Sequence, residues 1–342
     1  MILDMSGEAT LQTYDKKAEE KIERTDPYKG EFSPSSLSYS QCLRKFLFEK
    51  VYKLKSNHPQ YPLIYGVAIH EGVEFFYKNL RSETLTFNEV KAGCIQAFVK
   101  RWASYKVRGD DKRNLDAGIL ILDKYCDTYR HEDVLFETVD VEGAQWVQMP
   151  NGTMLLCKLD RLTVCDNMMS VIDTKSTTAY LNDRFFRQFQ QHISTSLYWH
   201  AMEYVYGKCD SIMIDAIRTP LLGPTSQSDQ FMRRSFQRTD LQMEEALRTY
   251  CKKTDYMIEG MQKRGKERLD HFYCDQNRCD DYSGCPFAGV CMHGIDHPMI
   301  GTDFKFENKE FETIAREDFS DNKVLHVQKW YVPSKHVPKD DK

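Results

Sequence analysis

Apolar side chains in the first 130 residues recur every three or four positions, which is typical of α-helices. The serines between positions 35 and 38 offer N-cap hydroxyls for the first helix, and the prolines at 59 and 62 break the pattern after it. Helices are therefore predicted at about 36–50, 66–80, 87–106 and 113–131.

After residue 133 the period shortens to the alternation of a β-sheet. Strands are predicted at 134–141, 145–148, 154–164 and 169–175, with turns at Pro150-Asn151-Gly152 and Asp166-Asn167. A helix at 183–206, a strand at 211–217 and a helix at 240–263 follow. A meander, a crossover helix and one more strand predict an α/β fold whose mixed central β-sheet is flanked by helices.

This pattern divides the chain into five expected segments. A flexible N-terminal arm (1–32) and a helical region (33–132) precede an α/β core (133–270), a cysteine-rich segment (271–300) and a C-terminal extension with a tail (301–342). A chain of 342 residues can bury a sizeable core without disulfides or metals.

Composition narrows the class of protein. The chain is 41% hydrophobic and 29% charged, which is globular, and it has no apolar run as long as the ~18 residues of a membrane span. The N-terminus lacks the basic start and long apolar stretch of a secretory signal, so a soluble, cytoplasmic protein with free thiols is expected. The net charge of −4 argues against a protein that coats nucleic acid, but it permits an enzyme with a local basic channel.

An acidic pair is the first candidate for chemistry. Asp173 and Lys175 are two positions apart in a predicted strand and share a face, and the preceding strand of the hairpin can place Asp160 beside them. Because two neighbouring carboxylates repel each other, a divalent cation such as Mg²⁺ or Mn²⁺ would stabilise the pair. The alternative is that these are ordinary charged residues at the surface ends of strands.

Two further residues are candidate contributors to this metal site. His70 lies at the edge of the buried face of its predicted helix, where its ring is either structural or a nitrogen ligand for the same metal. Glu137, on the first predicted strand, is a candidate outer carboxylate.

Cysteines crowd into one C-terminal loop. Turn-forming Gly284, Pro286 and Gly289 lie between them and let the loop curl its thiols inward. Four thiolates suit either Zn²⁺ or an iron–sulfur cluster, and the absence of a close C-x2-C pair favours the larger cluster. Unliganded thiols would leave this polar segment with nothing to order it. The four residues are Cys274, Cys279, Cys285 and Cys291.

Five motifs occur in order between residues 33 and 292: Ser35-x-Leu37-Ser38 followed by Cys42, Gly66-x-x-x-His70, Asp160, Asp173-x-Lys175, and the terminal cysteines. This arrangement resembles the PD-(D/E)XK nuclease superfamily. It is most similar to the RecB-like branch that carries an iron–sulfur cluster, which includes CRISPR-associated exonucleases, the AddB nuclease domain and phage-encoded relatives.

The resemblance implies a restriction-endonuclease-like core and a metal-dependent DNA exonuclease in DNA recombination or processing. It implies that Asp160 and Asp173 ligate the Mg²⁺ or Mn²⁺ together with His70 and the carbonyl of Thr174, and that Lys175 positions the attacking water. It also implies a 4Fe–4S cluster held by Cys42, Cys279, Cys285 and Cys291, with Cys274 as the rival of Cys42.

The chain departs from the family pattern at two places. Cys157 stands where a glycine usually precedes the first metal aspartate, and Ser194 stands where a glutamine usually precedes Tyr198 by four residues. Gln191 lies seven residues before Tyr198, on the same face of the predicted helix, and is the candidate substitute for that glutamine.

The resemblance implies DNA, single-stranded or at its ends, as the substrate, with a helicase or recombination protein as a candidate partner. Arg184 and Arg187 at the start of the crossover helix are the favoured DNA contacts, and Arg233 and Arg234 are further candidates. A non-catalytic DNA-binding subunit with a decayed nuclease fold and a zinc-stapled structural protein remain as alternatives.

Overall fold

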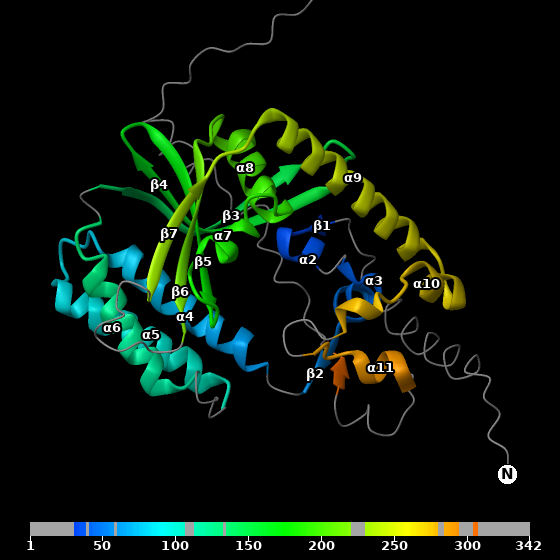
Figure 1. Ribbon diagram of the computed structural model, residues 1–342, viewed down its shortest axis with the longest axis horizontal. Coiled ribbons are helices and arrows are strands. Elements are labelled where there is room, and N and C mark those ends of the chain that lie inside the picture. Colours follow the sequence, from blue (N-terminus) through cyan, green and yellow to red (C-terminus); the bar gives the residue numbers. More distant parts are fainter. Residues whose placement is uncertain are drawn as a thin grey trace, which may run out of the picture.

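A mixed six-stranded β-sheet forms the centre of the computed structural model (Figure 1). The structure describes residues 31–38, 41–57, 60–106, 113–132, 135–219, 230–279, 284–293 and 304–306. The strands run in the order β1-β4-β5-β6-β7, and β3 also pairs with β4. Their bounds are β1 (Glu31–Phe32), β3 (Glu137–Gln148), β4 (Met154–Cys165), β5 (Met168–Thr177), β6 (Ser211–Arg218) and β7 (Phe231–Phe236).

A tight turn sets the register of the β4–β5 hairpin. Asp166 and Asn167 both have positive φ, which two-residue hairpin turns require and which short polar side chains tolerate. The turn pairs Cys165 with Met168, and the antiparallel pairing continues to Arg161 and Ile172. Beyond that pair the ladder between β4 and β5 stops. On its other edge β4 pairs with β3 from Met154 to Val164, and the start of β4 also pairs with β1.

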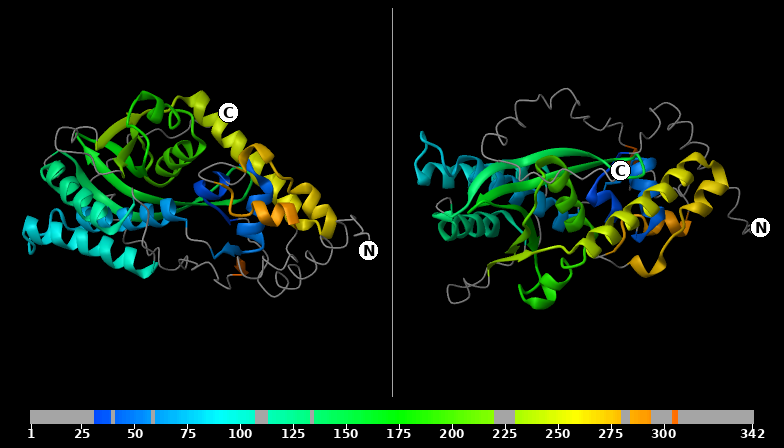
Figure 2. Two further views of the ribbon diagram at one scale, coloured as in Figure 1. Left: turned by 60° about the horizontal axis from the view of Figure 1, so that its bottom comes forward. Right: turned by 90° about the horizontal axis from the view of Figure 1, so that it is seen from above.

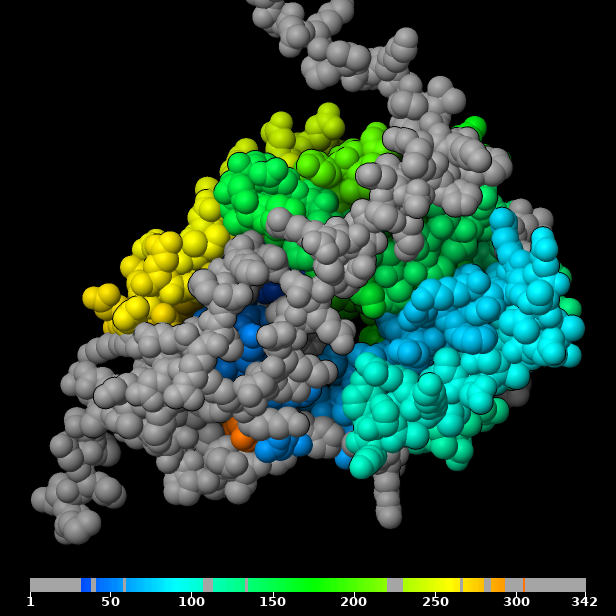
Figure 3. Space-filling view, turned by 180° about the vertical axis from the view of Figure 1, so that it is seen from behind, coloured from blue at the N-terminus to red at the C-terminus, as the bar shows by residue number. Residues whose placement is uncertain are grey.

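Helices cover both faces of this sheet (Figure 2). On one face α4 packs on β3 and β5, and α5 and α6 pack on α4; on the other, α8 packs on β3, β4 and β6, and α9 lies against α8. From behind, the surface of α4–α6 adjoins that of the green strands (Figure 3). The helices are α4 (Tyr61–Asn79), α5 (Phe87–Ser104), α6 (Leu115–Thr128), α7 (Asp183–Arg187), α8 (Ile193–Tyr206) and α9 (Asp240–Gln262).

Segments from the two ends of the chain meet beside the sheet (Figure 1). The Arg44 guanidinium donates to the carbonyls of Leu269 and Phe272 at 2.7 and 2.6 Å, and the Phe46 ring stacks on Phe272. A small antiparallel pair, β2 and β8, joins the same two segments. The elements here are α2 (Pro34–Ser38), α3 (Leu43–Phe46), β2 (Leu54–Ser56), α10 (Gly265–His271), α11 (Ala288–His293) and β8 (Phe304–Phe306).

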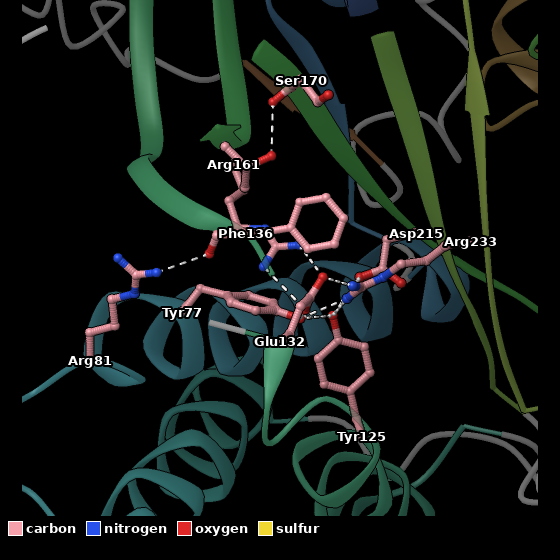
Figure 4. Close-up of polar contacts among 10 residues, drawn as sticks. Tyr77, Arg81, Tyr125, Glu132, Phe136, Arg161, Ser170, Asp215 and Arg233 are labelled. Atoms are coloured by element: carbon pink, nitrogen blue, oxygen red, sulfur yellow. Dashed lines mark hydrogen bonds and ion pairs between the residues drawn. The ribbon is translucent and has the colours of Figure 1, made fainter. Parts of the chain in front are cut away.

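A buried network of ion pairs, called the buried ion network below, connects the helical layer to the sheet (Figure 4). Glu132, which follows α6, pairs with Arg161 of β4 at 3.2 Å and with Arg233 of β7, and Arg233 also pairs with Asp215 of β6 at 2.9 Å. Tyr77 of α4 donates to Glu132 at 2.6 Å. Two cations balance two anions, so removing any one would strand a buried charge at a cost of about 3–5 kcal/mol.

The expected α/β class with a mixed, helix-flanked sheet is confirmed. The sequence pattern missed β7, and it divided β3 into two strands at 134–141 and 145–148 although the strand is continuous from Glu137. Residue 134 lies outside the described residues, as do the arm up to residue 30 and the tail beyond residue 306.

Helix boundaries differ from expectation at three places. The helix predicted at 36–50 is divided among α2, α3 and a π-helical turn at Leu47–Val51, and α4 begins at Tyr61 because Pro62 fits the first turn of a helix. The helix predicted at 183–206 is two helices, α7 and α8, separated by residues 188–192. No helix in the described part of the chain is long and apolar enough to cross a membrane.

The contact between α5 and α6 depends on one glycine. A Cβ at Gly118 would lie 2.0 Å from Cζ of Phe98, whereas a Cβ at Gly289 in α11 would meet no atom within 4 Å. We therefore expect Gly118→Ala to lower the free energy of unfolding by about 1–3 kcal/mol through overpacking, and Gly289→Ala to leave it equal or slightly higher. Denaturant melts of both variants test this, and equal stabilities would contradict the close packing.

Candidate metal centre and cysteine cluster

The candidate metal centre lies where β4 and β5 part. The hairpin register brings Asp160 level with Asp173, one step beyond the last paired residues. There the side chain of Asp160 replaces the missing ladder contact, because its Oδ2 accepts a hydrogen bond from the backbone N–H of Thr174 at 2.8 Å. The expected approach of Asp160 to the Asp173-x-Lys175 strand is thus present.

His70 and Glu142 extend the site on the side of α4. His70 Nδ1 lies 3.5 Å from Asp160 Oδ2, and one ligand atom from each of His70, Glu142 and Asp160 lies within 4.8 Å of the other two. One imidazole nitrogen and two carboxylates form a donor set that suits Mg²⁺ or, better, Mn²⁺, which accepts nitrogen more readily. These residues also line one small pocket together with Glu74 and Thr174.

Asp173 and Lys175 lie beside this group on β5, and Asp173 is not one of its three residues. Asp173 is 5% exposed, and its Oδ1 accepts a hydrogen bond from Lys175 Nζ at 2.5 Å. Burial, and then the Asp160 carboxylate, raise the pKa of Asp173, while the Lys175 ammonium opposes the rise. Burial alone would lower the pKa of Lys175, but the two carboxylates outweigh it and hold that pKa above its ordinary value. Lys175 is therefore an ammonium at neutral pH.

Gln191 and Tyr198 are the two candidates expected on the crossover helix. Burial raises the pKa of Tyr198 well above its ordinary value, and the nearby carboxylates of Asp173 and Asp160 contribute to the rise. Gln191 is exposed and precedes α8, which begins at Ile193, so the expectation that it shares a helix face with Tyr198 is wrong. His192 caps α8 instead, and burial followed by Lys175 lowers its pKa.

The candidate DNA contacts divide into exposed and buried residues. Arg184 and Arg187 are exposed on α7, while Phe185 and Phe186 between them are buried. Arg233 is not a surface residue, because it belongs to the buried ion network. Arg234 pairs with Asp183 at 2.8 Å.

Sequence reasoning missed Glu142 and named Glu137 only as a possible outer carboxylate. Glu137 is exposed at the start of β3, outside the group of possible ligands. Glu142 has a φ of 59°, which an L-residue rarely adopts, and it pairs with Lys158. The available signal was the Glu142-Gly143 step inside an alternating strand pattern, since a glycine at such a place marks an irregularity in the strand.

Five cysteines, rather than four, converge near α3 and α11. Cys42 is the N-cap residue of α3, and the Cys274 thiol lies within hydrogen-bonding reach of both Cys42 and Cys291. Burial raises the pKa of Cys274 to about 11, and the neighbouring Cys42 and Cys279 contribute to the rise. Burial also raises the pKa of Cys285, and the same two cysteines contribute there too. In the described part of the chain, no three of these sulfur atoms lie within 4.8 Å of one another.

A protein family and two solved structures are similar to this chain. A profile of the PD-(D/E)XK nuclease superfamily matches residues 31–292. A search of the curated proteins gives no match. Among solved structures, a candidate exonuclease from Eubacterium rectale is 12% identical, with 77% of this chain and 89% of that chain covered and a TM-score of 0.47. The protein SSO0001 is 14% identical, with 75% and 88% covered and a TM-score of 0.32.

The carboxylates at the parting strands predict divalent-cation binding. We expect Asp160→Asn to weaken Mn²⁺ binding by about tenfold or more and Glu142→Gln to weaken it less, because Asp160 also lies level with Asp173 across the hairpin. Glu74→Gln is the matched control, since Glu74 lines the same pocket but is paired with Lys78. Calorimetric titration with Mn²⁺ measures the affinities, and equal affinities for Asp160→Asn and the wild type would contradict the site.

Proposed function

The chain belongs to the PD-(D/E)XK nuclease superfamily, and on this premise we propose that it is a divalent-metal-dependent deoxyribonuclease, an exonuclease that acts on DNA ends or single strands. The observation that carries the proposal is the meeting of Asp160, Asp173 and Lys175 where β4 leaves β5. Its biological setting, on this proposal, is DNA recombination or processing, with a helicase or recombination protein as the candidate partner.

The donor set supports a bound Mg²⁺ or Mn²⁺. Asp160 and Asp173 would hold the ion together with His70 and the carbonyl of Thr174, and Glu142 lies near enough to Asp160 to take part. A bound ion of this kind lowers the pKa of a coordinated water and offsets the charge that develops on a phosphodiester under attack.

Lys175 acts in this scheme as a cation and hydrogen-bond donor. Asp173 and Asp160 hold its pKa above the ordinary value, so the amine is protonated at neutral pH. The hydrogen bond to Asp173 Oδ1 fixes the direction of Nζ, which leaves two N–H bonds to orient the attacking water and to contact a phosphate oxygen. Tyr198, with its strongly raised pKa, stays a neutral phenol beside the carboxylates and can donate a hydrogen bond there.

We propose further that Cys42, Cys279, Cys285 and Cys291 hold a 4Fe–4S cluster. A single tetrahedral Zn²⁺ would need sulfur atoms roughly 3.8 Å apart, and the wider spread of these thiols favours a larger cofactor. The nearby Arg44 and Lys45 would offset the negative charge of a thiolate-bound cluster, as they already lower the pKa of Cys291 and Cys285 against the effect of burial. Such a cluster would close most of the chain into one loop and so restrict the unfolded state.

The nuclease assignment predicts a loss of cleavage without a loss of fold. We expect Lys175→Met and Asp173→Asn each to reduce Mn²⁺-dependent DNA cleavage by roughly 10³-fold or more, because each removes a charge that acts at the reacting phosphate. Lys208→Met, which alters a lysine paired with Asp210 at the chain's surface, is the control.

DNA labelled at the 5′ or the 3′ end, in single- and double-stranded form, reports rate and polarity together. Full cleavage by both active-site variants would contradict the site. A wild-type protein that binds DNA but never cleaves it would favour the non-catalytic DNA-binding subunit, for which the displaced Gln191 is the supporting observation.

The cluster assignment predicts which thiols retain iron. In protein purified without oxygen, we expect Cys285→Ser and Cys42→Ser to lose most of the iron and to fall in stability, and Cys274→Ser to keep it. Iron analysis and the visible absorbance of the cluster measure this. Retention by Cys42→Ser with loss by Cys274→Ser would exchange the roles of the two residues, and a stable wild type with zinc or no metal would contradict the cluster.

A further inference from the structure

One exposed aromatic residue stands beside the candidate active site. Tyr180 follows the end of β5 and is 70% exposed. The guanidinium of Arg218 lies over its ring, 3.9 Å from the centroid, so one face of the ring is covered and the other is open. We call Tyr180 and Arg218 the stacking platform.

The strand register places this platform close to Lys175. In the parallel pairing of β5 and β6, Lys175 lies opposite Ala216 and Thr177 lies opposite Arg218. Residues two apart in a strand share a face, so Arg218 projects from the same face of the sheet as Lys175. Spacings of about 3.3 Å per residue and 4.8 Å between strands put the two Cα atoms roughly 8 Å apart.

Three aromatic residues near Tyr180 in the sequence or on α8 are buried, so they cannot stack on a base. Phe185, Phe186 and Trp199 are all less than 10% exposed and pack in the core. A base can therefore stack on Tyr180 but not on these three rings.

Positive charge near the platform is also uncompensated. Among the residues that the structure describes, no carboxylate pairs with Arg218, with Arg184 or with Arg187, the latter two being exposed on α7 immediately after the platform. Arg233 and Arg234, by contrast, are held by Glu132, Asp215 and Asp183. The platform and α7 thus present an open ring face with three available cations.

We propose that the open face of Tyr180 takes an unpaired base of the strand that enters the active site, while Arg218, Arg184 and Arg187 contact its phosphates. The proposal rests on the proposed nuclease function and names its substrate class: single-stranded DNA or the frayed end of a duplex. An aromatic side chain stacks on a base whose face is free, and in a duplex the faces are covered by the neighbouring base pairs. The platform therefore discriminates against fully paired DNA.

The test is DNA binding in EDTA, so that its outcome does not depend on cleavage. The full-length protein is titrated against a fluorescein-labelled 12-nucleotide oligo-dT and against a blunt-ended hairpin duplex, and anisotropy reports each Kd. We expect Tyr180→Ala to weaken binding of the single strand by about tenfold and of the duplex by less than twofold. Tyr180→Phe keeps the ring and should bind as the wild type does. Tyr204→Ala, which removes a 57% exposed tyrosine from α8, is the matched control.

An abasic scan locates the contact. Oligonucleotides that lack one base at successive positions should lose affinity for the wild type at one position, and Tyr180→Ala should be insensitive at that same position, because the ring and the base form one interaction. Equal weakening of single strand and duplex, or no weakening of either, would overturn the platform even if the protein cleaves DNA. A Tyr180-dependent single-strand affinity in a protein that never cleaves DNA would uphold the platform and overturn the nuclease.

Discussion

The structure depends on holding carboxylates together where two strands part. Asp160 and Asp173 lie level across a hairpin, and burial together with the Asp160 carboxylate raises the pKa of Asp173. Lys175 supplies one compensating charge and Thr174 one N–H, yet Glu142 adds a further acid to the same edge. An excess of negative charge in a partly buried place favours a cation, and His70, Glu142 and Asp160 line a small pocket beside α4 in which one could bind.

The rest of the fold keeps this edge in position. Arg161, next to Asp160 in sequence, lines the same small pocket and joins the buried ion network with Glu132 and Arg233. That network also contains Tyr77, which lies on α4 two turns after His70. The same charge-balanced cluster thus fixes both the strand that carries Asp160 and the helix that carries His70, so the two ligands cannot move independently.

The approach of Asp160 to Asp173 and Lys175 could be predicted from the sequence, because it depends on the local structure of one hairpin. Strand alternation and the Asp166-Asn167 turn fix the hairpin, and the hairpin fixes Asp160 against Asp173 and Lys175. Glu142 could not be placed by alternation, because its left-handed backbone interrupts the strand. Gln191 was misplaced because helical periodicity continues through residues 188–192 although the helix does not. The burial of Arg233 follows from partners distant in sequence, which a charge pattern alone does not identify.

Anomalous diffraction from crystals soaked in Mn²⁺ would show directly whether Asp160 and Asp173 share a bound cation. We expect a manganese peak between β4 and β5, with carboxylate oxygens of Asp160 and Asp173 and the ring nitrogen of His70 within about 2.5 Å of it. Crystals saturated with Mn²⁺ that show no peak there, and in which Asp173 remains bound to Lys175 alone, would contradict it.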